Sequence, residues 1–424
     1  MKLTVFQSGM GDCLLLTGAD GRRMMIDGGM ADAYDAHVSP SMGALQEKNQ
    51  KLDVVYVSHI DADHISGVLK MMNDQVEWRV HDFQKQNNNP GHQEPEVFRP
   101  PEVNEIWHNA FHEQLEKNSG PVEEMLAASA MMLSGGDSKK LRALAEIHHN
   151  LTSSIPQAIN LSRRVSPQQL NIPLNPPSGG KLMLVRDSKY PVMIGGMKVF
   201  IIGPHSDDLV VMRKKWNAWI KANQEALEKI EAKARADREN LGKNDVGAIT
   251  ALMIAQAEQF GNRDAVTPPN LASLMLLVEE NGKLILLTGD GHADDILKGL
   301  AHYGKLDASG RIHVDVLKVQ HHGAANNIHA QFCEAVKANH YIFCGNGQYD
   351  NPEPGVIELI FNSRSSDGEK FKMWFNSSAK AADSDDNKAH MKAVEKLVRK
   401  LARSSGGRMK FFFVKGSKFN LPRL

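Results

Sequence analysis

Potential metal ligands are concentrated in one short segment of the sequence. Ser58–His64 reads Ser-His-Ile-Asp-Ala-Asp-His and carries four imidazole or carboxylate side chains, those of His59, Asp61, Asp63 and His64. It directly follows Leu52–Val57, an apolar run that predicts a buried strand. A tight loop at the end of a strand can direct several side chains to one point, and these donor types bind Zn²⁺, Mn²⁺ or Fe²⁺. The segment therefore predicts a metal site.

Three other predicted strands end in residues of similar chemistry. Met25-Ile26 leads into Asp27-Gly28-Gly29, Leu286-Leu287 leads into Thr288-Gly289-Asp290, and Val316–Val319 leads into Gln320-His321-His322-Gly323. A glycine followed by an acid is a common signal for a turn after a strand. Two histidines before a glycine are more specific, because the glycine permits a tight turn. We expect Asp290 and His322 to lie near the first segment.

The elements that would position these residues are strands near both ends of the chain, with helical stretches between them. Apolar periodicity predicts strands at 2–7, 13–17, 23–26, 52–57, 102–108, 198–202, 271–278, 283–287, 313–319, 341–344 and 410–414. It predicts helices at 65–73, 293–303 and 389–403, a polar loop at 84–101, and helical insertions at 121–165 and 209–260. This pattern favours one α/β core with insertions over a string of independent domains.

The composition of the 424 residues is that of a globular chain, with 42% hydrophobic and 24% charged residues. Only three cysteines are present, which excludes a disulfide framework and favours a reducing compartment. The apolar stretches are too short to span a membrane, and the first residues do not resemble a signal peptide. We therefore expect a cytoplasmic protein without a membrane segment.

The formal net charge of zero conceals an uneven distribution. Residues 388–424 contain eleven Lys/Arg and one acid, a net charge of +10, so the preceding 387 residues carry about −10. This basic end is either a solvated helix face followed by a strand or a phosphate-binding edge. The insertion at 209–260 mixes both signs at helical spacing, which favours a surface for a protein partner or for self-association.

Taken together, the motifs resemble those of a known family. Val5–Asp12, Ile26–Gly29, Ser58–His64, Thr288–Asp290 and His321–Gly323 occur in the order seen in metallo-β-lactamase-fold hydrolases. The His-x-Asp-x-Asp-His form of the third motif is most similar to that of the soluble catalytic domain of ComEC competence proteins. The resemblance covers roughly 1–110, 196–205 and 268–362 and implies a four-layer αββα sandwich. It does not cover the helical insertions or the basic end. We expect one domain over 1–387 that holds both insertions, with 388–424 as a basic helix–strand extension packed on this core.

The resemblance also implies roles for individual residues. His59 and Asp61 would hold one metal ion, Asp63, His64 and His322 the second, and Asp290 would bridge the two. Asp27 would support the site without binding metal. A further family histidine is not evident in this sequence; Asn270 lies near its expected place, and His205 is an alternative. A late Gly-His-Pro of some relatives is replaced by Tyr349–Pro352.

The implied activity is that of a metal-dependent phosphodiesterase or nuclease acting on DNA. Two divalent ions, Zn²⁺ or Mn²⁺, would activate a hydroxide for attack on a phosphodiester. Asp63 would orient this hydroxide or accept its proton, and His321 or Lys318 would stabilise the developing negative charge. Two alternatives stay open. One is a hydrolase of a small molecule, and the other is a partner-dependent, degenerate subunit of a multi-protein system such as phage defence.

Overall fold

The computed structural model describes residues 1–109 except 88, 90 and 92, residue 157, and residues 160–207, 273–364 and 367–424. The predicted insertion at 209–260 lies outside the described residues. So does the insertion at 121–165, apart from residue 157 and residues 160–165. No helix in the described part of the chain is both long enough and apolar enough to cross a membrane.

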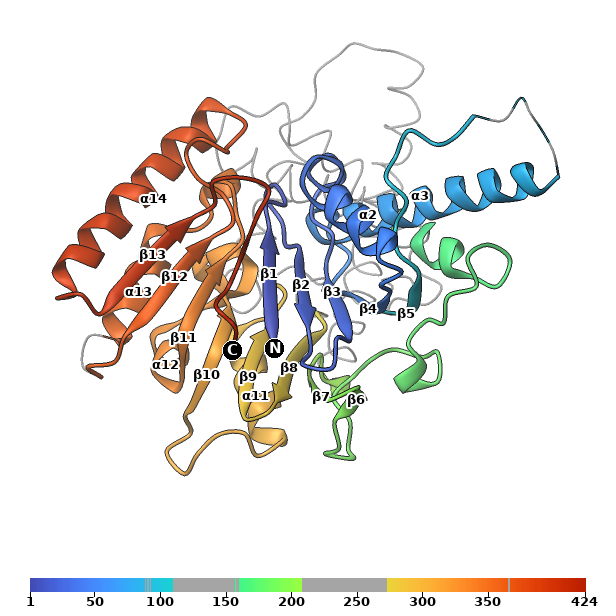
Figure 1. The fold of residues 1–424 in the computed structure, drawn as a ribbon. Coiled ribbons are helices and arrows are strands. Elements are labelled where there is room, and N and C mark those ends of the chain that lie inside the picture. The colour runs from blue at the N-terminus through green and yellow to red at the C-terminus, as the bar shows by residue number, and fades with distance from the viewer. Residues whose placement is uncertain are drawn as a thin grey trace, which may run out of the picture.

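Two β-sheets form the centre of the molecule (Figure 1). The first has six strands in the order β14-β1-β2-β3-β4-β5, with β1 Lys2–Phe6, β2 Leu14–Thr17, β3 Arg23–Ile26, β4 Leu52–Val57, β5 Val103–His108 and β14 Lys418–Asn420. The second has eight in the order β13-β12-β11-β10-β9-β8-β7-β6, with β6 Val192–Ile194, β7 Met197–Gly203, β8 Met275–Glu280, β9 Lys283–Leu287, β10 Ile312–Lys318, β11 Val336–Phe343, β12 Phe371–Phe375 and β13 Met409–Phe413.

The helices lie on both outer sides of this pair of sheets (Figure 1). They are α1 Ala31–Ala33, α2 Ser39–Glu47, α3 Ala62–Gln86, α11 Ala293–His302, α12 Ala330–Ala335, α13 Pro354–Ser363 and α14 Asp385–Ser404. In α14, buried Met391, Val394, Val398 and Leu401 recur every three or four residues and form one apolar stripe. The Ser384 side chain accepts a hydrogen bond from the Asn387 amide and caps the helix.

The buried apolar side chains form three clusters. One combines residues of both sheets, such as Leu16 and Tyr56 with Ile285 and Val316. A second joins the six-stranded sheet to α2 and α3, and a third joins the eight-stranded sheet to α11, α12, α13 and α14. A central strand such as β4 is therefore buried on both faces, which explains the apolar run Val54–Val57.

Parallel pairing brings the ends of several strands to one edge. β3, β4 and β5 are parallel, as are β9, β10, β11, β12 and β13. The carboxyl ends of parallel strands meet at the same edge of a sheet. The two sheets are joined near this edge, where the Leu274 amide donates a 2.7 Å hydrogen bond to the Ser58 carbonyl oxygen. The motifs that follow β3, β4, β9 and β10 can thus meet.

The predicted strands at 23–26, 52–57 and 283–287 are confirmed by β3, β4 and β9. The strands expected at 2–7, 13–17, 102–108, 198–202, 313–319 and 410–414 are also present, with bounds that differ by one residue. Some other predicted bounds were wrong. The helix expected at 65–73 spans Ala62–Gln86. The prediction was too short because apolar spacing marks only the buried first half, whereas the second half is partly or fully exposed to solvent. The strand expected at 271–278 is Met275–Glu280, and the one expected at 341–344 begins at Val336. β6, β12, β14, α1, α2, α12 and α13 were not predicted.

The basic carboxyl-terminal segment contributes to both sheets. α14 and β13 belong to the side of the eight-stranded sheet, where β13 pairs with β12. β14 then pairs with β1 in the other sheet, and the Leu424 amide donates to the Met1 carbonyl oxygen over 3.2 Å. Both termini lie side by side in Figure 1.

Candidate metal centre

The segment that joins β4 to α3 supplies His59 and Asp61, and the first turn of α3 supplies Asp63 and His64. His59 and His64 are buried, with ring centroids 4.0 Å apart. His64 lies in the first turn of α3, which passes close to the loop after β3. Gly28 and Gly67 permit this approach, because a Cβ on either residue would collide with the backbone of the other segment. The Gly28 amide donates to the His64 carbonyl oxygen over 2.8 Å.

Asp27 orients His64. Its fully buried carboxylate accepts hydrogen bonds from the Ser58 amide over 2.6 Å, from the Ser58 hydroxyl over 2.8 Å, and from His64 Nδ1 over 2.9 Å. A proton on Nδ1 leaves the Nε2 lone pair of His64 directed to the cluster, which is the form that binds a metal ion. Asp27 therefore lies where the resemblance places a supporting residue.

Asp290 follows β9 and lies among the imidazoles. Its Oδ2 is 3.5 Å from His59 Nε2 and 3.6 Å from His322 Nε2, and its Oδ1 is 3.5 Å from His64 Nε2. The carboxylate is 2% exposed. A carboxylate this close to three ring nitrogens could share a metal ion with more than one of the imidazoles.

The turn after β10 separates the two neighbouring histidines. His321 and His322 both have positive φ, 47° and 55°, a backbone conformation that is costly for residues other than glycine. The buried His322 directs Nε2 to Asp63 Oδ2 over 2.9 Å. His321 remains 30% exposed, with Nε2 3.5 Å from Asp290 Oδ2. The turn thus aims one imidazole into the cluster and the other to its rim.

Asn327 determines the orientation of His321. The Asn327 amide nitrogen donates to the Asp290 carbonyl oxygen over 2.8 Å, and its Oδ1 lies 2.6 Å from His321 Nδ1. Since Oδ1 can only accept, His321 Nδ1 carries a proton and the Nε2 of the neutral ring holds a lone pair facing the site. The sequence reasoning did not identify Asn327, whose only signal is its closeness to the histidine pair.

Asp12 is a second residue that the sequence reasoning did not assign to the site. It lies in the loop between β1 and β2, is buried, and has Oδ1 3.1 Å from His322 Nδ1. Its Oδ2 forms an ion pair with Lys318. The Asn376 amide holds this loop by donating to Ser8 Oγ over 2.9 Å and to the Phe6 carbonyl oxygen over 3.3 Å. The acid in the Gly-Met-Gly-Asp segment was the available signal.

Four of these side chains form a group that could hold a metal ion. One ligand atom each from Asp12, His64, Asp290 and His322 lies within 4.8 Å of the others, and all four residues are buried. Two carboxylates and two imidazoles are a donor set that suits Zn²⁺ or Mn²⁺. Three buried atoms in or beside the group have no hydrogen-bond partner among the described residues. They are His59 Nε2, Asp61 Oδ1 and Asp290 Oδ1. Such atoms are costly unless a ligand satisfies them, so the residues fit a bound cation.

The charges of the site also favour a cation. Burial lowers the pKa of each imidazole, but the neighbouring carboxylates outweigh it. They raise the pKa of His59 to about 9, mainly through Asp290, and that of His322 to about 10. The pKa of His64 is raised as well. The site without metal therefore holds protons on its imidazoles at neutral pH, where a metal ion can replace them.

Metal binding should strengthen as the pH rises. The raised pKa values of His59 and His322 mean that a metal ion must displace protons below about pH 9, so affinity increases from pH 6 to pH 9 and protons are released. Calorimetric titration of the metal-free protein at pH 7, in two buffers of different ionisation enthalpy, should detect at least one proton released per ion bound. Affinity that does not change with pH would contradict this.

The structure brings His59, Asp61, Asp63, His64, Asp290 and His322 into one region. Lys318 lies there too, but its side chain is 2% exposed and is held by Asp12 and by the Gly289 carbonyl oxygen at 3.1 Å. His205 follows β7 at the same edge and is not part of the four-residue group. Asn270 lies outside the described residues. Asn351, from the segment without the late histidine, is buried.

Comparison with known proteins finds a similarity over part of the chain. The search of curated proteins found no match. A family model does match, and the matched segment runs from the loop that holds Asp12, through Asp27 and the His59–His64 loop, into α3. Residues 8–77 thus match the metallo-beta-lactamase superfamily, whose members are generally metal-dependent hydrolases.

Proposed function

We propose that this chain is a metal-dependent hydrolase that cleaves phosphodiester bonds, with DNA as its substrate. The observation that carries the proposal is the buried group of Asp12, His64, Asp290 and His322 at the shared edge of the two sheets. The match of residues 8–77 to a superfamily of metallohydrolases supports it. The proposal includes the four-layer arrangement of helix, sheet, sheet and helix that the sequence resemblance implies, and a relationship to ComEC-type catalytic domains.

The proposed site takes two divalent ions, zinc or manganese. Asp12, His64, Asp290 and His322 would hold one, with Asp63 2.9 Å from His322 Nε2. His59 and Asp61, whose facing atoms are 3.6 Å apart, would hold the other together with Asp290. Ions bound there would supply Lewis-acid stabilisation of negative charge and activation of water near neutral pH.

The residues of the chain itself have distinct tasks in this proposal. Asp27 fixes the tautomer of His64, and Asp12 does the same for His322 through the 3.1 Å contact at Nδ1. Asp63 retains 15% exposure and can accept a proton from an incoming water molecule. His321, partly exposed at the rim and oriented by Asn327, can stabilise charge on the leaving oxygen when its Nε2 also carries a proton. Lys318 positions Asp12 from behind the site and does not reach the substrate.

Two further features support a phosphodiester of DNA over a small neutral substrate. Four carboxylates beside three imidazoles favour a divalent cation such as Zn²⁺ or Mn²⁺, which binds phosphate oxygens well. The segment 388–424 carries a net charge of +10, which would attract a polyanion. A protein partner or self-association through the insertions, and a cytoplasmic location, remain predictions from the sequence.

Cleavage of labelled single- and double-stranded DNA with Mn²⁺, Zn²⁺ or Mg²⁺ tests the proposed function. We expect metal-dependent products that chelation by EDTA abolishes. Cleavage of bis(p-nitrophenyl) phosphate but not DNA would reject DNA as the substrate and favour a small-molecule hydrolase. Bound metal without cleavage of either would reject the activity of the isolated chain and favour a partner-dependent subunit.

A further inference from the structure

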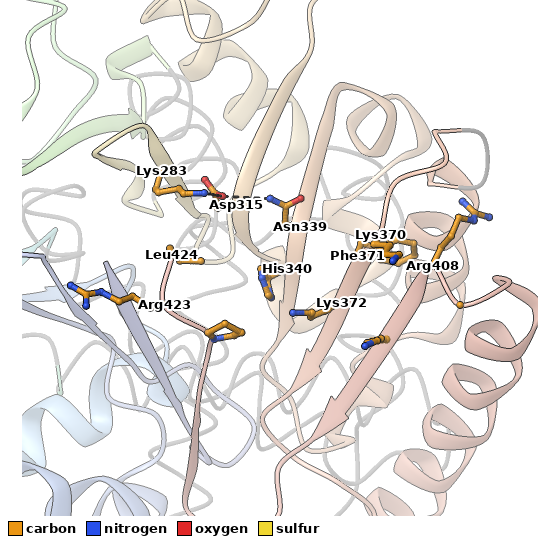
Figure 2. Close-up of a pocket in the computed structure, with 13 residues that line it drawn as sticks. Lys283, Asp315, Asn339, His340, Lys370, Phe371, Lys372, Arg408, Arg423 and Leu424 are labelled. Carbon is orange, nitrogen blue, oxygen red and sulfur yellow. Dashed lines mark hydrogen bonds and ion pairs between the residues drawn. The ribbon is translucent and has the colours of Figure 1, made fainter.

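A cavity of about 400 Å³ lies near the amino ends of several strands of the eight-stranded sheet. Figure 2 shows the side chains that line it. Its lining includes Lys283 at the start of β9, Phe371 at the start of β12, and Arg408 just before β13. The segment Pro422–Leu424 closes one side. The candidate metal ligands instead follow the carboxyl ends of β9 and β10. The cavity is therefore a site separate from that centre.

The lining of this cavity is strongly cationic. Its side chains include six Lys or Arg and one carboxylate, that of Asp315; the cations are Lys283, Lys370, Lys372, Arg408, Lys410 and Arg423. Asp315 forms a 3.1 Å ion pair with Lys283 Nζ, so its negative charge is balanced by that lysine (Figure 2). Arg408 donates to the backbone carbonyl oxygens of Ser405 and Arg364. Within the part of the chain that the structure describes, the other four cations form no ion pair.

His340 adds a hydrogen-bond donor without adding negative charge. Its Nδ1 accepts a 2.9 Å hydrogen bond from Trp374 Nε1, so the ring proton is on Nε2. Burial, and next to it the charge of Lys372, lower the pKa of His340 to about 4. The imidazole is therefore neutral at pH 7. Figure 2 shows its side chain beside that of Lys372, on the neighbouring strand.

An exposed aromatic ring lies next to these cations. Lys372 pairs in register with Lys410, and two residues further along the same strands Trp374 pairs with Phe412. Residues two apart on a strand share a face, so a pair of lysines borders a pair of aromatic rings. Phe412 is 42% exposed and stacks on Trp374 at 4.2 Å with an interplanar angle of 15°. β13 is the edge strand, so this face is open at its side.

We propose that these residues form a basic edge groove that binds single-stranded nucleic acid. The groove comprises Lys370, Lys372, Arg408, Lys410, Arg423 and Phe412. The cations contact successive phosphate groups, and one unpaired base stacks on Phe412. A single strand is favoured because stacking on this ring requires a base that is free of its partner. The proposal deepens the proposed function and rests on it only in the choice of nucleic acid as the polyanion.

Fluorescence anisotropy with a labelled oligothymidylate of about 20 nucleotides tests the groove on the full chain, in EDTA so that no cleavage occurs. The variant Lys372→Gln/Lys410→Gln should weaken binding at least about tenfold at low salt. Its slope of log affinity against log salt should be shallower by about 1.4, the value for two lost contacts to a single strand. Lys48→Gln/Lys85→Gln, with the same charge change at exposed positions in or next to α2 and α3, is the matched control and should bind normally.

A second variant separates stacking from charge. Phe412→Ala should weaken binding at least about fivefold and leave the salt slope unchanged, because it removes no cation. If the double variant does not fold, Arg423→Gln alone should still make the salt slope shallower by about 0.7.

Three results would overturn the groove proposal. They are unchanged binding by the folded groove variants, equal losses in the control, and preferential binding of inorganic triphosphate or blunt duplex DNA. Binding that depends on the groove in a protein that cleaves no DNA would refute the proposed function and leave the groove intact. Metal-dependent cleavage together with normal binding by the groove variants would refute the groove proposal and support the proposed function.

Discussion

Asp290→Asn should abolish hydrolysis and lower the metal content of the protein while leaving its fold intact. The carboxylate lies 3.5 to 3.6 Å from ring nitrogens of His59, His64 and His322. The amide keeps the shape of the side chain but carries no charge. Its NH₂ group replaces one carboxylate oxygen and is a hydrogen-bond donor, which cannot bind a metal ion in place of that oxygen. Losing even an outer partner of a metal ligand costs 10- to 100-fold, so we expect a loss of more than about 100-fold.

The measurement combines metal content by mass spectrometry with the rate of phosphodiester cleavage. Asp187→Asn is the matched control, because it makes the same chemical change at an exposed position in the described chain. The control should keep full activity and normal metal content. Asp290→Asn with wild-type activity and wild-type metal content would show that the centre has been assigned to the wrong residues.

Lys318→Met should strongly destabilise the metal-free protein. The ammonium group is buried, forms an ion pair with Asp12, lies 3.8 Å from Asp290 Oδ1 and donates to the Gly289 carbonyl oxygen. Removing one partner of a buried pair leaves an uncompensated charge, which costs about 3–5 kcal/mol of unfolding free energy. Added metal should restore part of this loss, because a cation again faces Asp12.

The pH dependence of this loss follows from the pKa of Asp12. Burial raises that pKa, but Lys318 and His322 lower it to about 2 overall, below the value of the unfolded chain. A lowered folded-state pKa gives stability that is present above about pH 4 and is lost as the pH falls to about 2. The difference in unfolding free energy between the wild type and Lys318→Met should therefore be large at pH 7 and smaller near pH 3.

Urea denaturation in EDTA at the two pH values measures this difference. Lys305→Met is the control, since Lys305 forms a 2.7 Å ion pair with Glu279 that is partly exposed, and such pairs contribute about 1 kcal/mol or less. Adding Asp12→Asn to Lys318→Met should recover stability by removing the unpaired charge. Wild-type stability of Lys318→Met together with lost hydrolysis would instead support the role in transition-state stabilisation that the sequence suggested.

The spans of the strands that lead to the metal centre were largely predictable from local pattern. β3, β4 and β9 coincide with apolar runs that stand out because both faces of each strand are buried. The helix and strand that escaped prediction between 344 and 389 were α13 and β12. Both are short apolar segments without a strong period, and short apolar runs are consistent with a buried helix or strand alike.

The depth of Lys318 could not be predicted from the sequence. A lysine at the end of an apolar strand beside two histidines suggested a group that contacts substrate. Its burial results from Asp12, which arrives on a loop 306 positions away and is held there by Asn376. Burial and charge pairing depend on neighbours from distant strands, and local periodicity carries no information about them.

The sequence by itself determined the kinds of ligand and the edge at which they gather, because strand ends and the residues that follow them are local properties of the chain. Only the tertiary structure decided which groups meet. It added Asp12 to the cluster, turned His322 inward and His321 to the rim through two residues of positive φ, and placed six cations around one cavity. These outcomes depend on how the two sheets pack against each other, which brings together side chains that lie hundreds of residues apart in the chain.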